Sequence, residues 1–207
     1  MYKDLPKMIA ESMWETGSIK VSVDNPIKMT SGKLSPFYID CRLLISYPLL
    51  RNSITAYAQW MLAEKKVAVD SIAGGETAGI PFAAWLAEKM NLPFVYVRKK
   101  PKGHGLTSQV EGRIEPGQSV LLYEDLITDG LSKINFLQGI RNAGGKVEHC
   151  LVVLDRLEGG EKKLAEENVK LYAVVTMDQC FDVGLKKGYL SEKEMAVIRS
   201  YLEKGSL

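Results

Sequence analysis

The sequence predicts an α/β fold: a mostly parallel, twisted sheet flanked by helices, with a small β-containing segment at the N-terminus. Two observations support this prediction. From about residue 71 onward, short apolar segments typical of buried strands alternate with helical segments, as in parallel sheets joined by crossover helices. Hydrophobic residues make up 46% of the 207 residues and charged residues 25%, which excludes a disordered or fibrous chain.

The first 45 residues are predicted to form a small hood beside a larger core. Their pattern indicates an amphipathic helix at 1–17 and a β-rich stretch at 18–42, which contains a strand at 37–39. The next helix is predicted at 48–64, because it begins with a proline and proline is favoured in the first helical turn.

The core is predicted to span residues 46–185, followed by a C-terminal helix within 186–207, all in a single domain. The expected strands are 71–73, 94–97, 119–123, 147–154 and 171–175, and the expected helices between them are 80–90 and 132–143. Ser191 and Glu194 have the spacing of a capping box, which predicts that the last helix starts there and ends near Lys204.

Charge and cysteine content limit the possible partners. The chain has 27 Lys and Arg against 25 Asp and Glu, a net charge of +2, so we expect no nucleic-acid partner and look for a local cluster of basic residues instead. The 3 cysteines are far apart and are expected to be buried thiols. No signal peptide or long apolar segment is found, so we expect a cytoplasmic protein that does not contact a membrane.

Polar or glycine-rich segments follow four of the predicted strands, at 74–79, 98–105, 124–132 and 155–160. Ligands of open α/β sheets bind beyond the carboxyl ends of the strands. The sequence therefore places the site at this edge of the sheet.

The segment 120–132 is the most informative of these. A predicted strand ends in the adjacent carboxylates Glu124 and Asp125, and a turn with Thr128 and Gly130 then opens a helix. Free N–H groups at a helix start suit a phosphate monoester, and paired carboxylates suit a vicinal diol or the water shell of a metal. The alternative is that the acids only solvate a strand end and that the turn is only a helix cap.

This segment resembles the phosphoribosyl-diphosphate (PRPP) binding motif of type I phosphoribosyltransferases. Three further segments, 31–38, 98–105 and 154–156, match the orotate phosphoribosyltransferase family in order and separation. The resemblance implies the type I phosphoribosyltransferase fold and the transfer of phosphoribose from PRPP to orotate, a step of pyrimidine nucleotide synthesis. It also implies Mg²⁺ bound through substrate and water, and a homodimer in which the 98–105 loop acts across the interface.

The resemblance also implies the site residues. PRPP would be bound by Arg98, Lys99, Lys102 and His104 and by the run Glu124, Asp125, Leu126, Ile127, Thr128, Asp129, Gly130, Leu131 and Ser132. The diphosphate loop would be Glu76, Thr77, Ala78 and Gly79, and orotate would contact Phe37, Tyr38, Thr128 and Arg156. Lys102, His104 and Asp125 would be catalytic, and no protein side chain would bind the metal directly.

Each of these segments also has a structural interpretation that stays open. The basic loop 98–105 suits a solvated hairpin tip, and the glycines at 74–79 suit a tight turn. Arg156 could pair with its neighbour Asp155, and aromatic side chains at 37–38 could belong to the core. Transfer to another base, such as a purine, and a non-catalytic PRPP- or nucleotide-binding regulator are the alternative functions.

The chain departs from the family pattern at four positions. Thr30 and Ala78 stand where many relatives have lysine, and Asp129 and Leu131 stand where small residues are usual. A carboxylate that faces the 5′-phosphate would repel it. We therefore expect that Asp129 points to solvent or that PRPP affinity is reduced.

Overall fold

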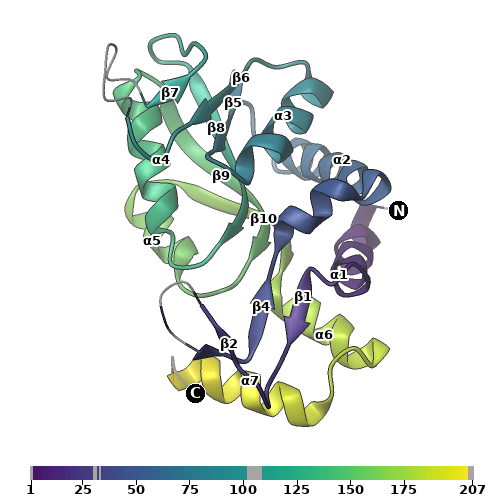
Figure 1. Ribbon diagram of the computed structural model, residues 1–207. Helices are drawn as coiled ribbons and strands as arrows, with labels where there is room; N and C mark the ends of the chain where they lie inside the picture. Colours follow the sequence, from purple (N-terminus) through teal and green to yellow (C-terminus); the bar gives the residue numbers. More distant parts are fainter. Residues whose placement is uncertain (1, 30–31, 33, 102–108, 205–207) are drawn as a thin grey trace.

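The computed structural model describes residues 2–29, 32, 34–101 and 109–204, and it contains a six-stranded sheet with the strand order β10-β9-β8-β5-β6-β7 (Figure 1). All neighbouring strands are parallel except β6 and β7. The strands are β5 (Ser71–Gly75), β6 (Phe94–Val97), β7 (Val110–Glu111), β8 (Ser119–Ile127), β9 (Lys146–Asp155) and β10 (Lys170–Thr176). The predicted fold class is confirmed.

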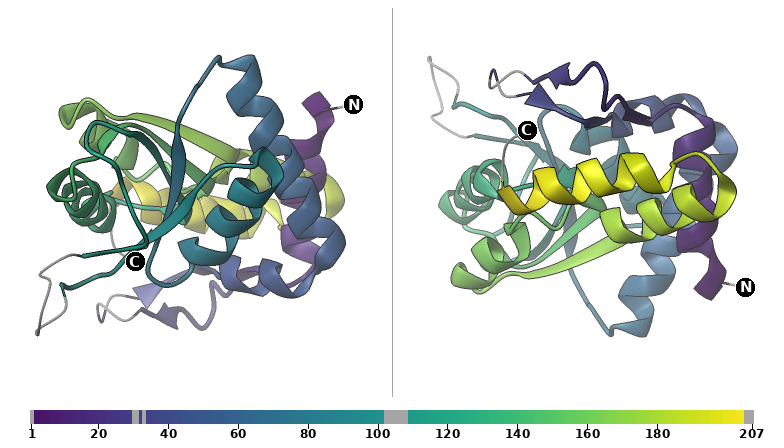
Figure 2. Two further views of the ribbon diagram at one scale, coloured as in Figure 1. Left: turned by 90° about the horizontal axis from the view of Figure 1, so that it is seen from above. Right: turned by 90° about the horizontal axis from the view of Figure 1, so that it is seen from below.

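Helices cover both faces of this sheet (Figure 2). One face is packed by α1 (Leu5–Glu15), α2 (Pro48–Glu64) and α3 (Gly79–Met90), and the other by α4 (Leu131–Asn142) and α5 (Gly160–Glu166). Phe82 and Leu86 of α3 are buried on the first face, and Phe136 and Ile140 of α4 on the second. The i, i+4 spacing of each pair gives its helix one apolar stripe, which is why the helix lies flat on the sheet.

The N-terminal hood consists of two short antiparallel ribbons. Strand β1 (Ile19–Val21) pairs with β4 (Phe37–Ile39), and β2 (Ile27–Lys28) pairs with β3 (Leu34–Ser35). The C-terminal helices α6 (Met177–Lys187) and α7 (Glu192–Lys204) pack beneath them, at the bottom of Figure 1. Phe37 contacts Phe181 and Tyr201 edge-on, so the two ends of the chain share one core.

The connections of the sheet determine where a ligand can bind. From β5 the chain moves to β6 on one side, and from β8 it moves to β9 and β10 on the other. The order therefore reverses between β5 and β8, which are direct neighbours. A crevice outside the carboxyl ends of the strands forms at such a reversal point.

Most predicted elements are confirmed, including the helix Pro48–Glu64 and the Ser191–Glu194 capping box, in which both side chains accept the expected N–H groups. One prediction is wrong: β8 continues to Ile127, so the two acids lie inside the strand and not after its end. Helices α5 and α6 were missed, although α6 has a capping box of its own at Thr176 and Gln179.

Two further observations concern the whole described chain. The 3 cysteines are buried free thiols, as predicted. Among the residues described, no helix has the length and apolar character that crossing a membrane requires.

Candidate active site

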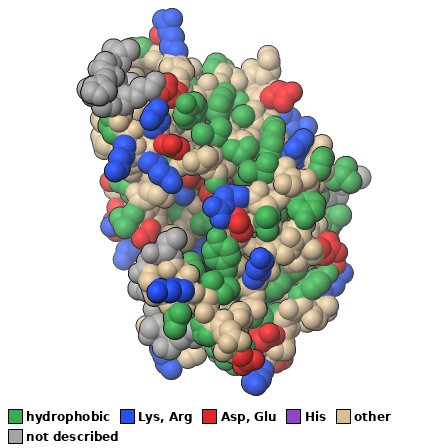
Figure 3. Space-filling model, in the orientation of Figure 1, with side chains coloured by type: hydrophobic (Ala, Val, Ile, Leu, Met, Phe, Trp, Pro, Cys, Tyr) green, Lys and Arg blue, Asp and Glu red, His purple; other side chains and the backbone are tan. Residues whose placement is uncertain are grey.

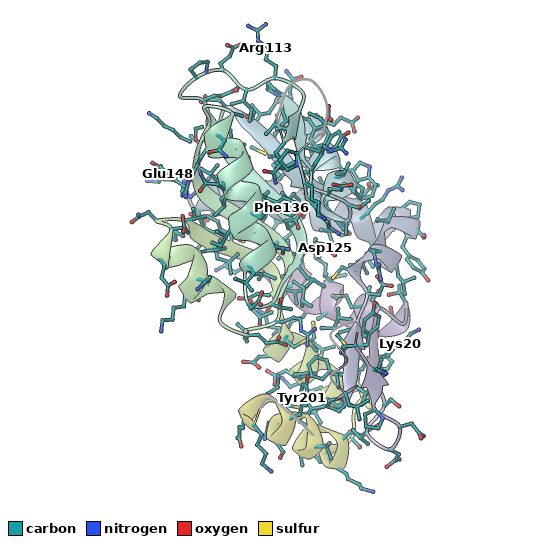
Figure 4. The ribbon with its side chains drawn as sticks, turned by 60° about the vertical axis from the view of Figure 1, so that its left-hand side comes forward. Lys20, Arg113, Asp125, Phe136, Glu148 and Tyr201 are labelled. Atoms are coloured by element: carbon teal, nitrogen blue, oxygen red, sulfur yellow. The ribbon has the colours of Figure 1, made fainter. Side chains whose placement is uncertain are left out.

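A cleft of about 430 Å³ lies at the carboxyl ends of β5 and β8, where the sheet order reverses. The hood borders it on the remaining side. Its lining comes from the hood (Tyr38, Ile39, Asp40, Cys41 and Arg42), the loop after β5 (Glu76, Thr77 and Ala78), Lys99, strand β8 (Glu124, Asp125 and Leu126) and helix α4 (Ser132, Lys133 and Phe136). Asp125 on β8 and Phe136 on α4, both labelled in Figure 4, line this cleft.

The two acids of β8 have different surroundings. Glu124 is buried, and both of its oxygens are engaged: Oε1 accepts the Gly75 N–H at 2.8 Å and Oε2 lies 2.9 Å from Lys133 Nζ. Burial raises the pKa of Glu124, and the positive charge of Lys133 only partly offsets this. Both Glu124 oxygens are thus engaged within the protein, although the side chain also lines the cleft, and its contact with a ribose stays a prediction.

Asp125 is half-buried and borders the cleft. Burial raises its pKa, while the Lys133 ammonium and nearby backbone N–H groups act in the opposite direction. A carboxylate in this position can accept hydrogen bonds from a diol that enters the cleft.

The segment 128–132 leads from β8 into α4. Gly130 has φ +81°, which suits glycine, and α4 begins at the next residue. Asp129 is exposed, which agrees with the expectation that it points to solvent. Its Oδ1 accepts the Leu131 N–H at 3.1 Å. The start of α4, where backbone N–H groups have no partner within the helix, borders the same cleft as Asp125.

The loop after β5 runs from Glu76 to Gly79 and lies directly against β8. A Cβ built on Gly75 or Gly79 would overlap Glu124 Oε1, so both glycines are required by the close approach of that side chain. Glu76 Oε2 accepts the Lys99 N–H at 2.8 Å, and Asn135 of α4 donates to the Lys99 carbonyl at 3.0 Å. These contacts fix the first residues of the basic segment beside the cleft.

The basic residues at 98–105 are only partly visible. Lys102 and His104 lie outside the described residues. Arg98 forms an ion pair with Glu111 at 3.4 Å, and no part of it lines the cleft. Lys99 lines the cleft of its own chain, and its action from a neighbouring subunit stays a prediction.

Arg156 and Phe37 form one unit behind the cleft. The guanidinium lies 5.0 Å from the centre of the Phe37 ring and forms an ion pair with Glu158 at 2.7 Å, so the alternative of a pair with Asp155 is wrong. Phe37 is fully buried, so the predicted contact between Phe37 and orotate is wrong and its ring instead supports Arg156. Tyr38 lines the cleft, where its hydroxyl accepts a hydrogen bond from Arg42 at 3.0 Å.

Comparison with known proteins decides the family. Residues 46–178 match the phosphoribosyl transferase domain. The chain is 40% identical to the orotate phosphoribosyltransferase of Rhizobium rhizogenes over 202 residues, which cover 96% of this chain and 87% of that protein. The chain belongs to the orotate phosphoribosyltransferase family.

Solved structures of relatives agree with this family. The orotate phosphoribosyltransferase from Aeropyrum pernix has a TM-score of 0.76 at 30% identity and covers 89% of this chain and 100% of its own. The UMP synthase of Leishmania donovani has a TM-score of 0.81 at 25% identity over 96% of this chain and 42% of its own. The resemblance found in the sequence is confirmed.

Seen as an orotate phosphoribosyltransferase, the chain has two cations at the cleft that were not predicted from its sequence. Lys133 is buried on α4, and Arg42 extends from the hood, where Asp40 holds it at 2.6 Å. A signal for Lys133 was present, because it occupies the apolar stripe of α4 together with Phe136, Leu137 and Ile140. Nothing in the sequence pattern singles out Arg42.

Proposed function

We propose that this orotate phosphoribosyltransferase transfers the 5-phosphoribosyl group of PRPP to orotate, giving orotidine 5′-monophosphate and diphosphate. The observation that supports it most is that one cleft is bordered by the Asp125 carboxylate, the diphosphate loop and the start of α4. These three features provide, in one place, an acceptor for ribose hydroxyls and backbone donors for both phosphate ends of PRPP.

The reaction is a displacement at the anomeric carbon of the ribose. A ring nitrogen of orotate forms the new bond while the bond to diphosphate breaks, so the protein needs no nucleophile of its own. The thiol of Cys41 lines the cleft, but burial raises its pKa well above the ordinary value and keeps it protonated. Asp125 holds the ribose hydroxyls and stabilises the positive charge that develops on the sugar.

The negative charges of PRPP are bound at its two ends, the 5′-phosphate and the diphosphate. The N–H groups of Gly130 and Ser132 at the start of α4 bind the 5′-phosphate, and that of Leu131 joins them once it is released from Asp129. Backbone donors at 76–79 and the cations Lys99, Lys102 and His104 bind the diphosphate. Closure of the basic segment over the cleft would also exclude water, which would otherwise hydrolyse PRPP.

Arg156 is proposed to bind the carboxylate or a carbonyl of orotate. It is buried, and its Nε has no hydrogen-bond partner among the described residues, so this donor remains available. The Phe37 ring and Glu158 hold the guanidinium in place. Tyr38 and Thr128 would border the base.

Mg²⁺ is proposed to be coordinated by PRPP oxygens and water. The described part of the chain contains no group of three or more His, Cys, Asp or Glu side chains placed to hold a metal, so a substrate-bound ion fits these residues better than a protein site. When bound, the ion would neutralise charge on the departing diphosphate. Chelation with EDTA should therefore abolish turnover without unfolding the protein.

A homodimer in which the 98–105 loop acts across the interface completes the proposal. Exposed Met8, Tyr47 and Leu49 surround a second hollow, of about 390 Å³, along α1 and α2, and apolar surface of this kind suits burial by a second copy. The charged side chains on the face in Figure 3 are of mixed sign, which does not oppose such an association.

The dimer is tested by mixing two inactive variants. Lys102→Ala and Asp125→Asn chains are unfolded and refolded together, so that heterodimers form. If the loop acts in trans, one site of each heterodimer is intact and roughly a quarter of wild-type activity returns with random pairing. If the mixture stays as inactive as its parts, the loop acts within its own chain.

Loss of orotate absorbance in the presence of PRPP and Mg²⁺ tests the activity itself. Wild type should consume orotate, and Asp125→Asn should lower kcat by about 100-fold or more. Adenine, guanine and hypoxanthine serve as competing bases, and their consumption in place of orotate would favour a different base. Binding of PRPP without turnover of any base would favour a non-catalytic regulator.

A further inference from the structure

Lys133 is a buried cation that the proposed mechanism does not use. It is the third residue of α4, and its side chain is only 8% exposed. Its Nζ donates to Glu124 Oε2 at 2.9 Å and to Ser132 Oγ at 3.3 Å. Burying an ammonium group is costly, so its presence at this position requires an explanation.

Stability alone does not provide that explanation. The other residues of this stripe, Phe136, Leu137 and Ile140, are apolar and buried, so an apolar side chain would be the ordinary choice at position 133. Replacing a buried ion pair by well-packed apolar residues is often neutral or stabilising. The pair between Lys133 and Glu124 is therefore a candidate for a functional role.

The position of the pair indicates what that role is. The second oxygen of Glu124 accepts the N–H of Gly75, the last residue of β5, where the diphosphate loop begins. Gly79, at the other end of this loop, also lies against Glu124 Oε1. Lys133, through Glu124, thus links α4 to both ends of the loop, and all three elements border one cleft.

The charges around the cleft also support a functional role for Lys133. Glu124 and Asp125 are adjacent carboxylates at a place where a polyanionic substrate is proposed to bind, and Ala78 provides no charge in the diphosphate loop. Lys133 faces both acids: burial lowers its pKa, but their negative charges more than compensate and keep the ammonium charged. The other titratable group facing the pair is the buried Cys150 thiol of β9, whose pKa is raised by burial to about 12, so it stays neutral.

We propose that Lys133 is a positioning residue of the PRPP site: it holds the Glu124 carboxylate against the diphosphate loop and compensates the negative charge of the two adjacent acids. Glu124 then stays turned toward Gly75, and Asp125 is left as the carboxylate for the ribose. This inference rests on the proposed PRPP site, which the same experiment tests separately.

Calorimetric titration with PRPP and Mg²⁺, between pH 6 and 9, compares four proteins: wild type, Lys133→Gln, Lys133→Gln with Glu124→Gln, and Lys187→Gln. Lys187 is the matched control, because it forms an exposed ion pair with Glu11 at 2.6 Å, away from the cleft. Near-UV circular dichroism confirms that each variant is folded. Glutamine at position 133 keeps a hydrogen-bond donor and removes only the charge.

Lys133→Gln should weaken PRPP binding about tenfold or more at pH 8 relative to wild type, with the KM for orotate changed by less than about threefold. Without the ammonium the pKa of Glu124 rises further, so the defect should shrink as the pH is lowered from 9 to 6. The double variant loses one positive and one negative charge, so the net charge beside Asp125 is the same as in wild type, and it should bind PRPP within about threefold of wild type at every pH. A purely structural role for Lys133 would give no such pH dependence.

The outcomes separate the two proposals. Failure of wild type to bind PRPP overturns the proposed function and this inference with it. If wild type binds and Lys133→Gln binds equally well, only the role of Lys133 is overturned. The role is also overturned if the double variant remains as weak as the single one, since Lys133 would then not act through Glu124. If Lys133→Gln does not fold, a folded double variant that binds PRPP like wild type supports charge compensation, and one that does not bind overturns it.

Discussion

Two ion pairs border the cleft, one at its floor and one at its rim, and their distances are similar. Glu124 and Lys133 lie 2.9 Å apart with side chains 5% and 8% exposed, and Asp40 and Arg42 lie 2.6 Å apart with side chains 21% and 61% exposed. The shorter pair is the one in contact with solvent. The distance within a pair is therefore a poor guide to its contribution to stability, and the burial of its side chains is a better one.

The difference follows from what each charge loses when its partner is removed. At the rim, water replaces the lost partner, so an exposed pair is worth about 0–1 kcal/mol. At the floor both side chains are buried, and a charge left there without its partner is costly. The floor pair also links α4 to the backbone of β5, whereas both members of the rim pair belong to one short stretch of the hood.

Removal of the floor cation should have the largest effect. Lys133→Met is expected to lower the free energy of unfolding by about 3–5 kcal/mol, because it leaves the Glu124 carboxylate buried without its counter-ion. Urea unfolding followed by circular dichroism measures this, with Lys187→Met as the exposed control, for which the loss should stay below about 1 kcal/mol. An equal loss of unfolding free energy in the two variants would contradict the distinction between buried and exposed ion pairs.

A methyl group inserted beside Glu124 should have the next largest effect. Gly79→Ala is expected to cost about 2–3 kcal/mol, although alanine favours helix and Gly79 is the first residue of α3, because its Cβ would displace Glu124 Oε1. The control is Gly188→Ala, where φ is +78° and no atom lies within 4 Å of the added Cβ, so only backbone strain of about 1 kcal/mol remains. Unfolding in urea compares them, and a smaller loss for Gly79→Ala than for Gly188→Ala would contradict the close packing around Glu124.

The rim pair of Asp40 and Arg42 should contribute little to stability, and this contribution should decrease as the pH falls. The hydrogen bond from Arg42 holds the pKa of Asp40 below its ordinary value of 3.8, so the stabilisation is present above that value and is lost as the pH falls further. Asp40→Asn should cost less than about 1 kcal/mol at pH 7, and the difference from wild type should shrink as the pH falls below 3.8. Thermal unfolding at pH 7 and pH 2.5 measures both values, and a gap that widens on acidification would reverse the assigned direction.

The same contrast explains which parts of the site could be predicted from the sequence. The fold and the strand-to-loop exits follow from apolar periodicity and glycine positions, which are local signals. The separation of Glu124 from Asp125 does not, because it depends on Gly75 and Lys133, which lie 49 and 9 residues from Glu124 in the sequence. The sequence left the burial of Phe37 open for the same reason: its neighbours Phe181 and Tyr201 come from the other end of the chain.

Asp129 provides the most sensitive test of the rim, because it lies next to the proposed phosphate site and yet is exposed. Its carboxylate accepts the Leu131 N–H at 3.1 Å, so in this arrangement it caps the start of α4 from the solvent side. Asp129→Thr keeps a hydroxyl acceptor for that N–H and removes the charge, so the KM for PRPP should change by less than about threefold, or below about 0.7 kcal/mol. Steady-state kinetics with varied PRPP measure this, with the KM for orotate as the internal control. A gain in PRPP affinity of about tenfold or more would mean that the carboxylate faces the 5′-phosphate during binding. The exposed Asp129 would then repel the substrate that the buried residues of the cleft help to bind.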